Sequence, residues 1–317
     1  MGNEDAQYEE GKRSAALPNS RAGRYEAIIQ RQIEAGILVC PETKKKLHVN
    51  DAGLLTTEDG SWSYRLANGG VPVLTADTRL LEEYAKSSET MNTKYTEKCL
   101  AKEQRLITRI RRHDYRTKAS VLAANSVLEG LDNNAVCLSI GGGPTRANEM
   151  YINLNVGPFP NVDIVGDAHK LPYADGCVDA IHCEAVFEHL QNPTLAASEI
   201  CRVLKQGGKA YVCTPFLQAY HGYPHHYQNF TLTGHVNLFE KSGLAVLTSG
   251  TCVGPIWVMR SMVSELIVHY APHSIRRGLQ AIWGGVSMLI APLDIFLRDK
   301  PNSHIMASTT YLVAEKL

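Results

Sequence analysis

The chain has 317 residues, 44% of them hydrophobic and 20% charged, which is typical of a soluble globular protein with room for one large α/β domain and a smaller unit. Lysine plus arginine and aspartate plus glutamate both number 32, so net charge indicates neither a nucleic-acid partner nor a membrane surface. The eight cysteines form no Cys-x-x-Cys pair, which favours reduced thiols in a cytoplasmic protein.

The first residues, 1–24, contain few large apolar side chains and no apolar core of a signal peptide, so they are predicted to form a mobile tail. A short amphipathic helix is predicted next, because Ile28, Ile29 and Ile33 share one helical face.

Residues 37–76 alternate short apolar runs with Asp-Gly and Asn-Gly turns, a pattern that predicts a small antiparallel β unit. With the preceding helix it is assigned as a β module over 25–76. Residues 77–130 are predicted to be a helical connection or cap. Between Lys94 and Lys118 they carry nine basic and three acidic residues, which indicates either an anion- or RNA-binding surface or a solvated helix face. The solvated face is favoured because aromatic side chains for base stacking are sparse, and no nucleic-acid partner is expected.

From 131 to 317, apolar runs of strand length alternate with helical segments, which predicts a doubly wound, mostly parallel sheet. A helical insertion is assigned to 256–300, and residues 256–297 of it are apolar. A Gly-Gly pair and Pro292 break this stretch, so no transmembrane segment is predicted. The stretch is interpreted as a substrate cap, an interfacial helix near lipid, or a buried or dimer-forming face, which leaves a homo-oligomer as one outcome.

The most informative stretch is 136–214. It reads VCLSIGGGP, then INLNV, then IVGDAHKLPYADGCVDAIHCEAVFEHL, then EICRVLKQGGKAYVCTPF. This stretch resembles the core of class I S-adenosylmethionine-dependent methyltransferases, most of all the small-molecule branch that includes the ubiquinone-biosynthesis enzymes. The resemblance implies a Rossmann-like sheet of seven strands, closed by a late strand over 308–315, with S-adenosylmethionine bound at the carboxyl ends of the strands.

The resemblance also implies how the cofactor is held. The glycine turn would approach the amino-acid arm, Asn155 would hold the ribose hydroxyls in place of the family's acid, and Asp167 would accept the adenine amino group. Only Pro144–Met150 separate the glycines from the next strand, so the usual first helix is expected to be lost or reduced to a turn. The predicted cofactor-binding residues are Ser139, Gly141, Gly142, Gly143, Asn155, Asp167, Ala168 and Glu184.

Without the resemblance, these residues have ordinary structural interpretations. The glycines make a tight turn, Asn155 ends a strand, and Asp167 caps a turn.

The resemblance also bears on two further residues. Ser139 stands where the family usually has an acidic residue, and Glu184 ends its strand facing the transferable methyl in the family's topology.

A stretch rich in histidine and tyrosine follows Pro215, where the family forms its acceptor pocket. Histidine suits the removal of a proton from an acceptor, although polar loop residues contacting a cap are an alternative. The predicted catalytic residues are His189, His221, His225, His226 and Tyr227. The three loop histidines have spacing that zinc tolerates, but no carboxylate or cysteine companion is evident nearby, so no metal is predicted.

The β module is itself similar to the small zinc-ribbon-like module that activates certain tRNA and protein methyltransferases. Cys40-Pro41 and Gly70-Val71-Pro72-Val73-Leu74 match it. Thr43 replaces the second cysteine and no downstream pair follows, so structural zinc is not expected. The module is interpreted either as a fused docking or lid unit or as a β cap over a sheet edge.

Together these features predict a methyltransferase that acts on a small metabolite or natural-product intermediate. Two alternatives remain open. The first alternative is an enzyme that attacks the aminocarboxypropyl arm of S-adenosylmethionine in an intramolecular cyclisation and releases methylthioadenosine. The second is a catalytically inactive protein that keeps the methyltransferase fold and binds a partner.

Overall fold

The computed structural model describes residues 19–67, 70–77, 81–83, 116–144, 146–159, 161–222 and 225–317. Most of the predicted tail and most of the basic stretch between Lys94 and Lys118 lie outside these residues.

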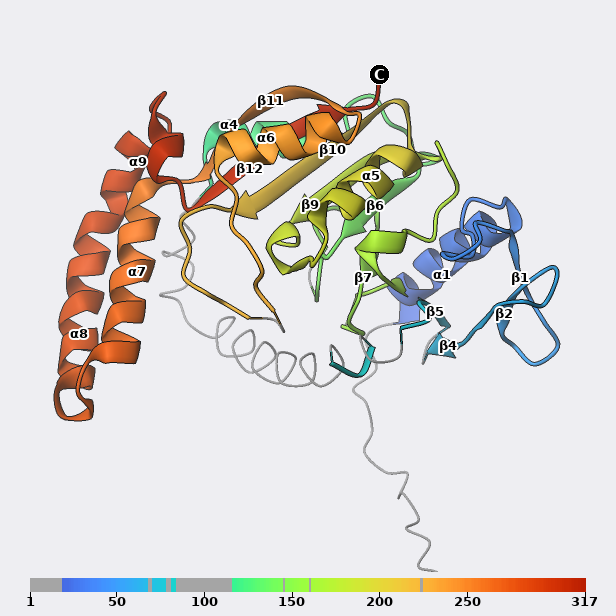
Figure 1. Ribbon diagram of the computed structural model, residues 1–317, viewed down its shortest axis with the longest axis horizontal. Helices are drawn as coiled ribbons and strands as arrows, with labels where there is room; N and C mark the ends of the chain where they lie inside the picture. Colours follow the sequence, from blue (N-terminus) through green and yellow to red (C-terminus); the bar gives the residue numbers. More distant parts are fainter. Residues whose placement is uncertain are drawn as a thin grey trace, which may run out of the picture.

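A nine-stranded sheet is the centre of the described fold (Figure 1). Its order is β11-β12-β10-β9-β6-β7-β8-β5-β4. All neighbours from β10 to β5 pair in parallel, whereas the late strand β12 inserts antiparallel between β10 and β11. The strands are β4 Leu66–Ala67, β5 Val71–Leu74, β6 Cys137–Ile140, β7 Tyr151–Asn155, β8 Ile164–Gly166, β9 Val178–Glu184, β10 Leu204–Pro215, β11 Ala245–Val253 and β12 Thr309–Glu315. The predicted mostly parallel Rossmann-like sheet with a late closing strand is confirmed.

Helices pack on both faces of this sheet (Figure 1). Helix α4 (Lys118–Ser126) buries Ala123 against residues of β10, β11 and β12 on one face. Helices α5 (Pro193–Val203) and α6 (Leu232–Lys241) pack on the other face, in the same core as α1 (Asn19–Glu34). The central strands are therefore buried along their whole length, as expected of a sheet covered on both sides.

Local side-chain caps fix where the helices after β9 and β10 begin. The Asn192 side chain accepts a hydrogen bond from the Leu195 N–H at the start of α5, and Thr231 accepts one from the Gly234 N–H at the start of α6. Each cap satisfies a backbone donor that has no partner within the helix.

The connection between β6 and β7 contains no helix among its described residues in 141–150, as predicted from its length. Parallel neighbours usually need a longer crossover. Here Arg146 forms a two-pronged ion pair with Asp163, with nitrogen–oxygen distances of 2.7 and 2.9 Å and side chains 11% and 9% exposed. The Arg146 guanidinium also lies 3.8 Å from the centre of the Tyr25 ring on α1. The N-terminal helix and this ion pair thus stabilise the short connection.

The N-terminal β module contributes to two sheets. Strands β1 (Leu47–Val49), β2 (Leu55–Thr57) and β3 (Ser63–Tyr64) form a small antiparallel sheet, as predicted. Strand β5 instead pairs in parallel with β8, and β4 pairs antiparallel with β5. The module therefore covers the β8 edge of the main sheet, in line with its interpretation as a cap.

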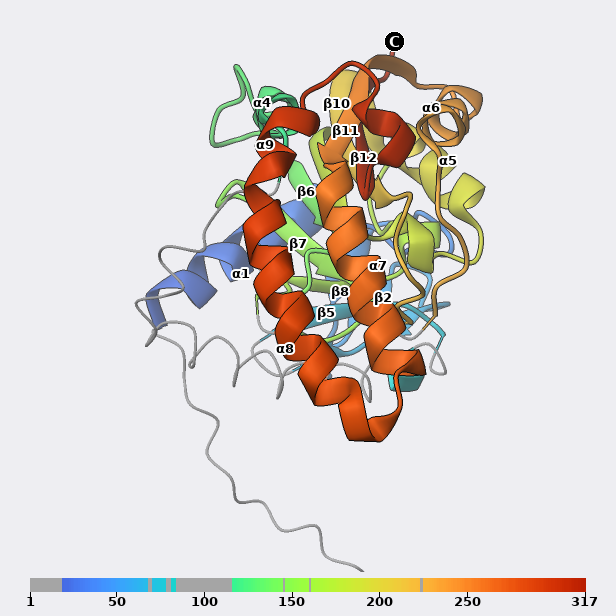
Figure 2. The ribbon, with the colours of Figure 1, turned by 90° about the vertical axis from the view of Figure 1, so that its left-hand side faces the viewer.

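A helical hairpin lies between β11 and β12 and runs along one side of the molecule (Figure 2). It consists of α7 (Pro255–Tyr270) and α8 (His273–Ile290), followed by the short helices η3 (Ala291–Leu293), α9 (Asp294–Leu297) and η4 (Ser303–Met306). No residue of α8 is buried. The helical stretch His273–Leu297 is long and apolar enough to cross a membrane, although soluble proteins also contain such helices. The sequence analysis expects no transmembrane segment here because of the Gly-Gly pair and Pro292, and this stays a prediction.

Breaking the buried ion pair tests its role in the connection. We expect Arg146→Ala to lower the free energy of unfolding by about 3–5 kcal/mol, because it leaves the Asp163 carboxylate buried without its partner. The double variant Arg146→Ala/Asp163→Ala should lose less than the sum of the two single variants, measured by urea denaturation. Strictly additive losses would show that the two side chains do not depend on each other.

A buried histidine makes stability depend on pH. His235 on α6 is fully buried, and burial lowers its pKa to about 3. Because the unfolded value is about 6.5, the unfolded chain binds one more proton between these pH values, and this group removes up to about 1.4 kcal/mol of stability per pH unit as pH falls. We expect the unmodified chain to lose unfolding free energy relative to His235→Phe as the pH falls from 7 to 5, measured in denaturation experiments at both pH values. A difference that is constant with pH contradicts the assignment.

Candidate functional site

A cavity of about 610 Å³ lies at the carboxyl ends of β6, β7, β8 and β9. In open α/β sheets, ligands bind at this edge, where neighbouring strands leave a crevice. The described residues that line it and that the sequence had singled out are Gly141, Gly142, Gly143, Asn155, Asp167, Ala168, Glu184, His189, His221, His225 and Tyr227.

The glycine turn after β6 has no room for side chains at its first two positions. A Cβ on Gly141 would lie 2.1 Å from the Val186 side chain, and Gly141 has a φ of +75°. A Cβ on Gly142 would lie 2.4 Å from the Asn153 carboxamide oxygen. Gly143, at φ +58°, faces open space, so the backbone is accessible to a ligand there.

Asn155 and Asp167 lie at the ends of β7 and beyond β8, and both line the cavity. The Asn155 side chain accepts a hydrogen bond from the Gly157 N–H at 2.9 Å. Asp167 accepts two bonds through Oδ1, from the His169 N–H at 2.9 Å and from its ring Nδ1 at 2.7 Å. Burial acts to raise the pKa of Asp167, but the bonds from His169 outweigh it and leave this pKa below its ordinary value. Asp167 is therefore an anion that both caps a turn and faces the cavity.

Ser139 does not line this cavity. It is buried and borders a neighbouring cavity of about 620 Å³, which shares Gly141, Gly142 and Glu184 with the first. Side chains alternate across a strand, so Ser139 and Ile140 point to opposite faces of the sheet. The predicted contact of Ser139 with a ligand in the larger cavity is therefore not supported by its position.

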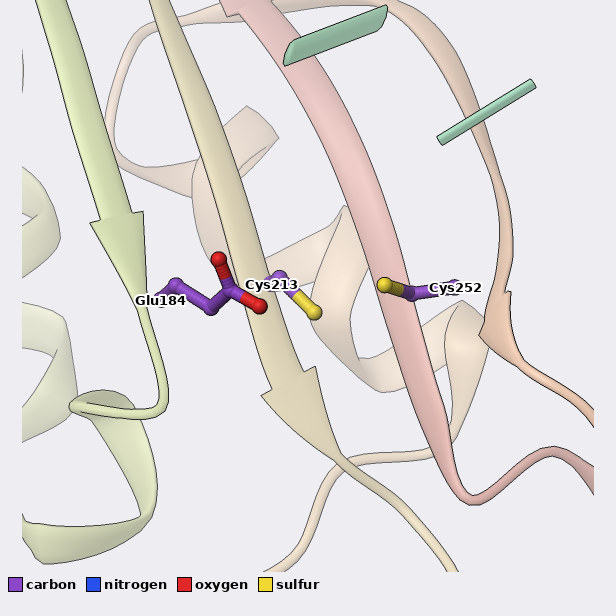
Figure 3. A group of neighbouring side chains, drawn as sticks. All are labelled: Glu184, Cys213 and Cys252. Carbon is purple, nitrogen blue, oxygen red and sulfur yellow. The ribbon is translucent and has the colours of Figure 1, made fainter. Parts of the chain in front are cut away.

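Glu184 ends β9 between the two cavities, and Ala185 follows it with a φ of +56°, an unusual backbone conformation for a residue with a side chain. Figure 3 shows that the Glu184 carboxylate lies near two thiols, Cys213 of β10 and Cys252 of β11, with β12 between these two strands. A hydrogen bond with Cys213 lowers the pKa of Cys252 to about 7. The Arg116 guanidinium lies 3.7 Å from Glu184 and disfavours a metal cation at this cluster.

The predicted acceptor-side residues come from two segments that hydrogen-bond to each other. The first is the short helix η2 (Phe187–His189), and the second is the loop after β10. The Tyr227 N–H donates to the Glu188 carbonyl at 2.8 Å, and the Gln228 side chain donates to the carbonyls of Phe187 and Leu190. His226 is set back from the cavity, where its Nδ1 accepts the His221 N–H. Four of the five predicted catalytic residues therefore meet at the cavity wall.

A residue that sequence reasoning missed is Glu188. Its side chain is 1% exposed, and its Oε1 lies 3.7 Å from His189 Nε2 and 3.8 Å from His221 Nε2. This carboxylate raises the pKa of His221, whereas burial lowers the pKa of His189. Its position in the sequence could have indicated it, because Glu188 directly precedes His189, which is a predicted catalytic residue.

The cavity wall is acidic. Asp77, Glu83, Asp167 and Glu184 line it, and the described lining residues include no lysine or arginine. Carboxylates around a concave site favour a cationic ligand over an anionic one. The site therefore combines an accessible glycine backbone, an acceptor at Asp167 and carboxylates on its wall, of which Glu184 lies 3.7 Å from Arg116 and Glu83 lies 2.8 Å from His225.

Comparison with known proteins gives this site a family context. Residues 144–212 match a family described as a methyltransferase domain. The chain is 44% identical over 59 residues to an uncharacterized chloroplastic methyltransferase of Arabidopsis thaliana, which is 18% of this chain and 16% of that protein. It is 37% identical over 58 residues to an uncharacterized 37.1 kDa transposon protein of Streptomyces fradiae, 18% of this chain and 17% of that protein. These matches span only a small part of either relative's length.

A solved structure similar to the chain is Haemonchus contortus phosphoethanolamine N-methyltransferase 2, in complex with phosphomonomethylethanolamine and S-adenosylhomocysteine. It shares 14% identity with a TM-score of 0.39 and covers 63% of this chain and 52% of its own. The residues matched by the family include Asn155, Asp167 and Glu184 at the cavity. The family match supports the predictions of a methyltransferase domain and of S-adenosylmethionine as its cofactor.

Proposed function

We propose that this protein transfers a methyl group from S-adenosylmethionine to a small metabolite or natural-product intermediate. The observation that carries the proposal is the acidic cavity at the carboxyl ends of β6–β9, with a bare glycine backbone on one side. S-adenosylmethionine is a sulfonium cation with an amino-acid arm, and its methyl group is transferred by direct displacement, which leaves S-adenosylhomocysteine.

The cofactor half of the site is built from the strand ends. The backbone at Gly142 and Gly143 receives the amino-acid arm, Asn155 faces the ribose, and Asp167 accepts the adenine amino group. Asn155 lacks the charge of a carboxylate and already accepts the Gly157 N–H, so it contributes less to ribose binding than an aspartate would. Glu184 places a carboxylate near the sulfonium end, and Arg116 at 3.7 Å offsets part of its charge.

The acceptor half of the site is built from η2 and the loop after β10. His189, His221 and His225 line this part of the cavity together with Tyr227. Their role is to position the acceptor and, for an acceptor that carries a proton, to receive that proton.

The N-terminal β module is proposed to act as a built-in docking or lid unit, similar to the zinc-ribbon-like activators of other methyltransferases. Two observations support this proposal: β5 extends the main sheet beside β8, and Asp77, just after β5, lines the cavity. Homo-oligomerisation through 256–297 and a cytoplasmic location stay predictions.

Replacing Asp167 tests the cofactor site. Asp167→Asn keeps an oxygen for the His169 N–H but turns an amide N–H₂ toward the adenine amino group, so two donors face each other. We expect binding of S-adenosylhomocysteine, measured by isothermal titration calorimetry, to weaken by about 1–3 kcal/mol. Asp132→Asn is a matched control, because Asp132 also caps a turn but does not line the cavity.

An unchanged dissociation constant for Asp167→Asn removes this residue from the site. No binding to the unmodified chain at millimolar S-adenosylhomocysteine contradicts the enzymatic proposal and favours an inactive binding protein. Release of methylthioadenosine from S-adenosylmethionine would instead indicate attack on the aminocarboxypropyl arm.

A further inference from the structure

The geometry points to a binding site for a divalent transition-metal ion formed by Glu188, His189 and His221. The Oε1 of Glu188 and a ring nitrogen of each histidine lie within 4.8 Å of one another. The sequence alone predicts no metal, because no carboxylate or cysteine companion is evident near the loop histidines. The fold supplies that carboxylate from η2.

The spacing of the three atoms fits an ion between them. The two distances from Glu188 Oε1 to histidine Nε2 are 3.7 and 3.8 Å, which is longer than a hydrogen bond. A first-row ion about 2.0–2.2 Å from each ligand separates those ligands by roughly 3–3.6 Å. The two Glu188–histidine separations therefore shorten by a few tenths of an ångström around one ion. The two histidine nitrogens lie within 4.8 Å of each other and approach by up to about 1.2 Å to reach the same range.

Both histidines are held in the tautomer that a metal requires. The Nδ1 of His189 lies 2.5 Å from the His225 carbonyl oxygen, and the Nδ1 of His221 lies 2.9 Å from the Ala219 carbonyl oxygen. A carbonyl only accepts, so each Nδ1 donates a proton and each neutral ring keeps its Nε2 lone pair toward Glu188. A backbone carbonyl behind the ring is the usual outer partner of a metal-bound histidine.

Glu188 is an independent sign that a ligand is missing. Its Oε1 is buried and accepts no hydrogen bond from any described residue, whereas its Oε2 faces the Thr214 hydroxyl at 3.4 Å. A buried carboxylate oxygen without a partner is costly, and an ion at the triad removes that cost.

The ligand set also indicates the kind of ion and its place in the reaction. Two imidazoles and one carboxylate suit Zn²⁺, Fe²⁺ or Mn²⁺ better than Mg²⁺ or Ca²⁺. Three protein ligands leave coordination positions open, and His189 and His221 both line the cavity. The open positions therefore face the acceptor half of the site. If the proposed function is right, on which this last step rests, the acceptor binds the ion through an oxygen donor.

Metal titration tests the site without S-adenosylmethionine. Protein stripped with a chelator and dialysed should bind one Zn²⁺ per chain by calorimetry, and Co²⁺ should give visible d–d absorption bands that Zn²⁺ displaces. Glu188→Gln and His221→Ala should weaken Zn²⁺ binding by more than about 100-fold, because the loss of even an outer partner costs 10–100-fold. His225→Ala is the matched control, since it changes a cavity histidine outside the triad and keeps the carbonyl that orients His189.

The outcomes separate the metal site from the proposed function. Equal loss of Zn²⁺ binding in His225→Ala, or no stoichiometric binding by the unmodified chain, overturns the metal site. Retained binding of S-adenosylhomocysteine by Glu188→Gln shows that the variant is folded, so its loss of Zn²⁺ then supports the triad. Zn²⁺ binding in a chain that does not bind S-adenosylhomocysteine would contradict the proposed function alone.

A different observation carries a second inference, about the α7–α8 hairpin. Large apolar side chains on α8 face solvent, among them Ile282 at 67% and Leu289 at 80% exposure. The two helices are joined to each other by Arg260, which bonds to Ser287 and accepts the Trp283 indole N–H through its carbonyl. The hairpin is thus internally ordered while one of its helices presents an apolar surface.

The charges of the hairpin indicate what covers it. Residues 266–293 contain no aspartate or glutamate, and the helix ends beside the turn carry His269, His273, Arg276 and Arg277. His269 lies 3.1 Å from Glu265, one helical turn before it. An apolar helix with basic residues only is complementary to a surface of anionic lipids, in which such a helix lies at the headgroup level. We infer that this hairpin docks the protein on an anionic bilayer.

Vesicle co-sedimentation tests the docking surface. The protein should sediment with vesicles that contain phosphatidylglycerol, and more weakly with pure phosphatidylcholine or at high salt. Leu289→Asp and Arg277→Glu should each reduce sedimentation several-fold, whereas Leu122→Asp, an exposed apolar position on α4, should not. Equal sedimentation of Leu289→Asp overturns the inference. The inference is also overturned if the protein does not bind vesicles and instead forms a dimer, seen by analytical ultracentrifugation, that Leu289→Asp dissociates.

Discussion

The site depends on a buried charge pair that replaces a helix. The connection from β6 to β7 is too short for the usual crossover, and Arg146 and Asp163 stabilise it by a two-pronged ion pair. The same carboxylate accepts the Asn153 backbone N–H, and the Asn153 side chain donates to the Gly143 carbonyl at 3.1 Å. The ion pair, one asparagine and the glycine turn therefore form one connected network. The glycine backbone that lines the cavity is thus connected to a buried charge pair.

Two different parts of the chain supply the two halves of the site. The ends of four parallel strands form one wall, and this wall has the glycine turn and Asp167. The other wall comes from η2 and the loop after β10, which are joined through Tyr227 and Gln228. One wall thus belongs to the sheet, whereas the other is made of segments outside it. This division is consistent with a common cofactor and a variable acceptor.

Much of the fold follows from local pattern. Apolar runs such as Cys137–Ile140 and Val178–Cys183 are strands because they are buried on both faces, and the polar residues after them mark the carboxyl edge. Asp167 and the glycines were therefore predictable as cavity residues. Ser139 was wrongly expected at the cavity. The resemblance to the family gives its position along the strand, but the pleat of the strand decides to which face of the sheet its side chain points.

Other features depend on contacts between distant segments. Glu188 gains its place beside His221 because the loop after β10 folds back onto η2, and no spacing in the sequence shows this. The pairing of β5 with β8 brings the N-terminal module to the sheet edge, although more than 80 residues separate the two strands. Hydropathy alone does not distinguish a buried helix from an exposed one, so the exposure of α8 was not predictable either.

The central claim is that the cavity above β6–β9 holds a nucleoside sulfonium. A crystal structure of the protein grown with saturating S-adenosylhomocysteine tests it most directly. The account predicts density for the nucleoside with adenine beside Asp167 and the amino-acid arm against Gly142 and Gly143. A cavity without that density, or one filled by the chain's own side chains, would contradict it.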